Sequence, residues 1–149
     1  MRPFVGVAVA TLLFAGCGDD TGPADTAGAL SVRDVWARPT APGAPTAAFY
    51  FAVENTGTQA DRLLGATSSA CLSTMVHRST VDDGVTSMEP TSAEELTLEP
   101  QGRLAFEPGG LHVMCLGLVT PLTEGADIDL RLTFEMAGGV DVTAAVEDR

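Results

Sequence analysis

From Leu30 to the C-terminus, the chain is a succession of short β-branched and aromatic runs separated by glycine, proline and aspartate. No long apolar pattern has the spacing of a helix, so a core must form between strands. The sequence therefore predicts an all-β domain. Its expected strands are 30–37, 47–55, 61–68, 74–79, 85–89, 95–99, 103–107, 111–119, 127–136 and 140–147.

The segments between these strands have the composition of turns. NTGTQ, DDG and EPGG are rich in residues that favour tight turns, and the proline-rich stretch 38–46 cannot be a central strand. Strands that recur about every ten residues are typical of a two-sheet sandwich or a small Greek-key barrel.

The first residues have the pattern of an export signal. Arg2 precedes an apolar run over about residues 4–14, and small residues follow before Cys17. This run is too short to span a membrane. The ending LFAGC resembles a bacterial lipobox, in which the cysteine becomes the lipidated first residue, so Cys17 is the expected anchor. Simple secretion with cleavage nearby is the alternative.

The chain then divides into three parts. Residues 1–17 are the expected lipoprotein signal peptide. Residues 18–29 lack large apolar side chains and read as a flexible tether, and 30–149 form a single folded domain. The protein is therefore expected to be exported and held by lipid on the extracytoplasmic face of the bacterial membrane.

The charge of the mature chain argues against nucleic acid as a partner. Removal of residues 1–16 takes away Arg2 and no acid, which leaves 7 basic and 20 acidic residues and a formal charge of −13. The acids are scattered rather than clustered, so solubility explains them.

The cysteines predict a covalent link. If Cys17 carries lipid, Cys71 and Cys115 remain, and an even pair in an exported protein is usually a disulfide. Two buried thiols are the alternative.

The stretch LHVMCLGL places His112 and Met114 two residues apart in an expected strand. Side chains alternate along a strand, so these two share one face while Cys115 points to the other. Core packing would explain one such pair. More soft donors are needed to indicate a metal site.

Two further donors complete a candidate set. The turn signal VDDGV between His77 and Met88 predicts a hairpin that brings them together. Two imidazoles and two thioethers suit Cu(I) better than Zn(II), Mg(II) or Ca(II). We therefore predict a copper site made by His77, Met88, His112 and Met114.

With this motif, the chain resembles the periplasmic copper chaperones of the PCu(A)C family. The family pattern is a His, ten residues, a Met, about twenty-one residues and then His-x-Met. WARPTAPGAPTAAFYFAVENTG, DRLLGATS, LEPQGRLAFEPGGLHVMCLGL and LRLTFEMAGGVDV also look like that family, so the resemblance covers roughly residues 30–147. It implies a cupredoxin-like fold and a role that is not enzymatic.

Two features depart from the family pattern. Met88 and His112 are separated by twenty-three residues, and Arg78 stands where many members carry a methionine after the first histidine. Met75 shares the expected face of His77 and is a spare soft donor, although core packing is the interpretation we favour. Met136 has no partner histidine and is also expected to pack.

By this resemblance, the protein would deliver Cu(I) to the dinuclear copper site of cytochrome c oxidase subunit II, together with a thioredoxin-like Sco-type protein. Such delivery needs access for the recipient, so the copper site is expected near the surface. Two alternatives stay open. One is a surface lipoprotein with a non-metal sandwich used for adhesion or as a scaffold. The other is a blue-copper electron carrier, although Cys115 follows Met114 where such a site would need a cysteine ligand.

Overall fold

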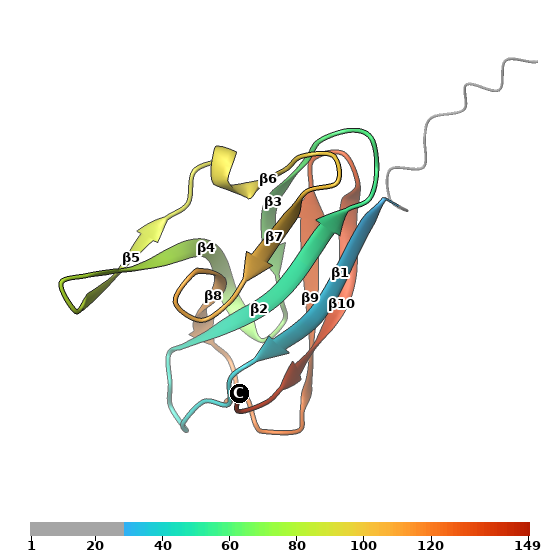
Figure 1. Cartoon of the computed structure of the whole chain (residues 1–149). Coiled ribbons are helices and arrows are strands. Elements are labelled where there is room, and N and C mark those ends of the chain that lie inside the picture. The colour runs from blue at the N-terminus through green and yellow to red at the C-terminus, as the bar shows by residue number, and fades with distance from the viewer. Residues whose placement is uncertain (1–28) are drawn as a thin grey trace, which may run out of the picture.

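A computed structural model describes residues 29–149 of the chain as an all-β domain with ten strands and one short 3-10 helix (Figure 1). No helix among these residues is long and apolar enough to cross a membrane. The elements are β1 Leu30–Ala37, β2 Thr46–Asn55, β3 Asp61–Thr67, β4 Cys71–Asp82, β5 Val85–Pro90, η2 Glu94–Leu96, β6 Thr97–Leu98, β7 Arg103–Phe106, β8 Leu111–Leu118, β9 Asp127–Phe134 and β10 Gly138–Val146.

Nine of the expected strands occur close to their predicted places, and the expected strand 95–99 is mostly wrong. Its first part is the helix η2, and only β6 remains as strand. The reason is a reciprocal cap: the Glu95 carboxylate accepts a hydrogen bond from the Ser92 backbone N–H, and the Ser92 hydroxyl accepts one from the Glu95 N–H. This cap favours a helical turn over an extended start.

The strands form one strongly bent sheet in the order β5-β4-β8-β7-β2-β1-β10-β9-β3-β6, with β8 also paired to β2. A bulge between Arg33 and Trp36, where Asp34 has a φ of 53°, lets β1 pair with β2 and also run parallel to β10. The bend brings β3 back to β4, where the Thr74 hydroxyl donates to the Ala66 carbonyl. The result is a β sandwich, as the strand spacing predicted, and it is of the cupredoxin-like type that the family resemblance implied.

The core lies between the two halves of this bent sheet. Phe49 and Val53 of β2, Val113 of β8, Leu132 of β9 and Val146 of β10 are at most 1% exposed. Alternate residues of β8 point inward, so the same strand that fills the core presents its other face outward.

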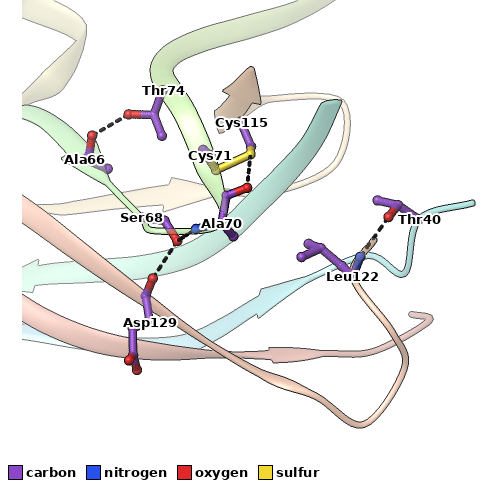
Figure 2. Close-up of a disulfide and its surroundings, with 9 residues drawn as sticks. All are labelled: Thr40, Ala66, Ser68, Ala70, Cys71, Thr74, Cys115, Leu122 and Asp129. Atoms are coloured by element: carbon purple, nitrogen blue, oxygen red, sulfur yellow. Dashed lines mark hydrogen bonds between the residues drawn. A yellow bond between two sulfur atoms is a disulfide. The ribbon is translucent and has the colours of Figure 1, made fainter. Parts of the chain in front are cut away.

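The structure joins Cys71 and Cys115 in a disulfide, with their Cα atoms 5.4 Å apart (Figure 2). Cys115 is fully buried, and its Sγ lies 3.9 Å from the Ala70 carbonyl oxygen. The Ser68 hydroxyl accepts from the Ala70 N–H and donates to the Asp129 carbonyl, which fixes the turn before β4. The link thus ties the start of β4 to the core side of β8.

The hairpin of β4 and β5 projects from one end of the sheet (Figure 1). Its two-residue turn consists of Asp83 and Gly84, whose φ angles are 49° and 81°, as the turn signal predicted. The pairing starts directly at Asp82 and Val85, so β4 extends beyond the expected segment 74–79. All of β5 is exposed, and it forms an edge of the sheet.

The disulfide generates a first testable prediction. When the full chain is denatured without reduction, thiol labelling read peptide by peptide should leave Cys71 and Cys115 unmodified. The bond spans 44 residues, so its reduction should lower the free energy of unfolding by about 3 to 4 kcal/mol, measured by denaturant titration.

The Cys71→Ala/Cys115→Ala variant is the matched control, because it should show the lower stability with or without reductant. Labelling of both cysteines in the unreduced wild-type protein would contradict the assignment.

Candidate metal centre

The pairing of β4 with β8 gathers the predicted histidines. His77 lies directly opposite His112, and Met75 lies directly opposite Met114. Opposed residues of an antiparallel pair share one face of the sheet, and so do residues two apart on one strand. The four side chains therefore form two adjacent cross-strand rows on the face opposite the core.

His112 is held in a fixed orientation. Its side chain is buried, at 4% exposure, and its Nδ1 lies 3.2 Å from the Gly110 carbonyl oxygen. A carbonyl can only accept, so Nδ1 carries the hydrogen and Nε2 holds the free lone pair. Nε2 is buried without a partner. This arrangement is typical of a metal-binding imidazole oriented through its other nitrogen.

His77 faces His112 across the strand pair. The two ring centroids are 6.0 Å apart, and the ring planes are nearly perpendicular at 83°. The Nδ1 of His77 is also buried without a partner. A buried polar atom left unpaired costs about 1–3 kcal/mol. Two such atoms on neighbouring rings are therefore candidates to bind one shared ligand.

The two predicted thioethers are placed differently. Met114 is partly buried beside His112, on the central strand β8. Met88 lies opposite Ser79, one row beyond His77, and is 54% exposed on the edge strand β5. The hairpin therefore puts Met88 on the face of His77, as predicted, but diagonal to it rather than opposite.

The expected surface location holds for only part of the site. Met88 is open to solvent, whereas His112 is buried. The strand period predicts which face a side chain takes, but it does not predict what covers that face.

Core packing was the wrong expectation for Met75 and Met136. Met75 is 46% exposed opposite Met114. Met136 is 55% exposed after the end of β9, and its backbone N–H donates to the Asp61 carboxylate. Only Met75 joins the histidines.

Arg78 does not belong to the donor set. Its Nε donates to the Glu95 carboxylate at 2.6 Å, and that carboxylate also accepts the Ser92 N–H. The Ser92 N–H and the Arg78 guanidinium hold the pKa of Glu95 below its usual value. Thr91 donates its backbone N–H and its hydroxyl to the Val76 carbonyl. These contacts tie the segment after β5 to β4.

The Gly110 carbonyl has a role in the site that the sequence did not predict. This oxygen lies beside His112 Nδ1 and also accepts the Ser79 N–H at 3.0 Å, so one atom orients the ring and fixes β4 against the turn before β8. The sequence feature that could have indicated this role is the EPGG turn just before His112 and Met114. Gly109, with a φ of 82°, makes that turn possible.

The arrangement offers imidazole and thioether donors. Within residues 29–149, no group of three or more His, Cys, Asp or Glu side chains is placed to hold a metal ion. Cys115 is bonded to Cys71 on the core side, so it cannot supply the thiolate of a blue-copper site. The set beside the two histidines suits a soft monovalent cation.

Comparisons with known proteins agree with this geometry. The family model described as "Putative lipoprotein LpqE-like" matches residues 30–146. A protein of Leifsonia xyli subsp. xyli (strain CTCB07), described as "Putative lipoprotein Lxx21020", is 30% identical over 126 residues, which are 85% of this chain and 74% of that protein.

The chain is also similar to solved structures, including PCuAC domains. The copper-bound PCuAC domain from PmoF2 is 29% identical, with a TM-score of 0.67, and the match covers 82% of this chain and 95% of that one. The apo PCuAC domain from PmoF1 is 27% identical with the same TM-score, covering 82% and 96%. Cu(I)-loaded DR1885 from Deinococcus radiodurans is 26% identical with a TM-score of 0.60, covering 83% and 85%.

The strand order, the paired histidines and these matches have one consistent explanation: the chain belongs to the LpqE-like lipoprotein family, and its folded part is a domain of the PCuAC type.

Proposed function

We propose that this protein is an extracytoplasmic Cu(I)-binding metallochaperone and not an enzyme. The observation that carries the proposal is the pair of buried, unpartnered imidazole nitrogens, His77 Nδ1 and His112 Nε2, on facing strands. Met114 lies beside them on β8, and Met88 lies on the adjoining hairpin.

The donor types select the cargo. Thioether sulfur is soft and uncharged, so it favours Cu(I) over Zn(II), which prefers thiolate, imidazole and carboxylate. All four donors are neutral when the imidazoles are unprotonated, so the bound ion keeps a single positive charge. Copper-bound relatives of the same fold support this choice of metal.

The proposed donors differ in how rigidly they are held and in their exposure to solvent. His112 and Met114 stand on a central strand whose other face is in the core, whereas Met88 stands on an exposed edge. Transfer of a metal by ligand exchange requires that some donors stay bound to the metal while another dissociates from it. Met88 is the donor that a recipient reaches first.

The proposed recipient is the dinuclear copper site of cytochrome c oxidase subunit II, with a Sco-type protein as a further partner. Resemblance to the PCu(A)C chaperones is the support for these partners. The proposed location is the extracytoplasmic face of the bacterial membrane, with the lipid on Cys17. Cys17, residues 1–17 and most of the tether lie outside the described residues, and the lipoprotein descriptions of the family and its relative support the anchor.

A second prediction tests Met114 as a ligand. Met114→Leu keeps the volume and apolarity of the side chain, so it should cost less than about 1.5 kcal/mol of apo-protein stability. It should weaken Cu(I) binding at least tenfold, because leucine has no donor atom. Affinity and stoichiometry are measured by competition with a Cu(I) chelator.

Met136→Leu is the matched control, since Met136 is exposed in the turn after β9, where its N–H donates to Asp61; it should leave copper binding unchanged. His77→Ala should be at least as damaging as Met114→Leu. A wild-type protein that binds Cu(I) no better than the Met114→Leu variant would refute the proposed function.

A third prediction concerns the anchor. Cys17→Ser should move the protein from the membrane fraction to the soluble fraction, because the lipidated cysteine is the expected membrane attachment once the signal is cleaved. Fractionation and the mass of the N-terminal peptide check this. An unlipidated, soluble wild-type mature chain would contradict the lipid anchor without affecting the copper proposal.

A further inference from the structure

Among residues 29–149, Met75 is the one soft donor outside the proposed set that shares the sheet face of His77, His112 and Met114, which we call the proposed copper face. It lies directly opposite Met114, in the row next to the one formed by His77 and His112. Cβ atoms of opposed residues are about 4.5–5.5 Å apart, and rows on one face are about 7 Å apart along a strand. The backbone position of Met75 therefore places its thioether close to His77, His112 and Met114.

The backbone of Met88 lies farther from the donors on β8. Its strand β5 is separated from β8 by β4, so its backbone lies two strand spacings, about 10 Å, from that of His112 and Met114. Met75 lies one spacing from both. In the sheet register, Met75 is the nearer of the two methionines to the β8 donors.

The surroundings of Met75 leave it free to move. Its side chain is 46% exposed. The residue also borders an open hollow of about 410 Å³ that Leu64, Pro90, Thr91 and Leu96 line as well. A flexible thioether with room beside it can change rotamer at little cost.

We propose that Met75 is a substitute copper ligand that replaces Met88 when Met88 gives way to a recipient. This inference rests on the proposed function and adds an exchange step to it. In that step, the bond between copper and the Met88 sulfur breaks and a bond to the Met75 sulfur forms. Both donors are neutral, so the copper stays Cu(I) and no proton or electron moves. His77, His112 and Met114 hold the ion throughout.

The test is a double-mutant cycle on the full chain, with Cu(I) affinity measured by chelator competition. Met75→Leu alone should weaken binding less than threefold, because Met88 is still present. Met88→Leu alone should weaken it less than Met114→Leu does, because Met75 takes its place. In the Met88→Leu background, Met75→Leu should cost at least a further tenfold. The matched control is Met136→Leu in that background, which should cost nothing.

A second measurement reports on the sulfur itself. In the chain labelled with ¹³C at the methionine methyl groups, the Met75 signal of the Met88→Leu variant should shift when Cu(I) is added, and the Met136 signal should not. Assignments come from the single leucine variants. Leucine at position 75 preserves bulk, so a packing role predicts no extra loss of affinity.

The outcomes separate this inference from the proposed function. If the wild-type protein binds Cu(I) and Met114→Leu weakens it, but Met75→Leu adds nothing in the Met88→Leu background, the substitute role is refuted and the chaperone proposal stands. If the wild-type protein does not bind Cu(I), both are refuted.

Discussion

The register between β4 and β8 is the constraint on which the rest of the site depends. It places His77 opposite His112 and Met75 opposite Met114. The same register puts Val113 and Cys115 in the core, where Cys115 bonds to Cys71. A slip of one strand by one residue would turn its side chains over and put the two histidines on opposite faces of the sheet. Burial of the core side and the disulfide therefore keep His77 and His112 together on the other face.

This coupling explains how a small domain tolerates two unpaired imidazole nitrogens. Each costs free energy in the apo protein, because neither atom has a hydrogen-bond partner. The apolar packing behind β8 keeps the rings in position, and the Gly110 carbonyl orients His112. Preorganisation of this kind lowers the cost of ordering the ligands when a metal binds.

The sequence was sufficient for most of the fold and for the grouping of the donors. Periodicity of two predicted the faces of β4 and β8, and VDDGV predicted the hairpin that carries Met88. It could not predict the exposure of Met75, because a sheet face is covered or open according to the whole topology. It also missed η2, where the local cap between Ser92 and Glu95 outweighs an alternating apolar pattern.

Arg78 shows why position along a strand outweighs nearness in sequence. It follows His77 directly, but alternation turns it away from the proposed copper face, and its guanidinium reaches Glu95 instead. Met75 is two residues from His77 and shares its face. A methionine at position 78 would have to leave the regular strand geometry to reach the imidazoles, whereas one at position 75 needs no such change. The departure from the family pattern at Arg78 therefore leaves the donor set intact, and the charged side chain gains a structural role in holding the segment that follows Met88.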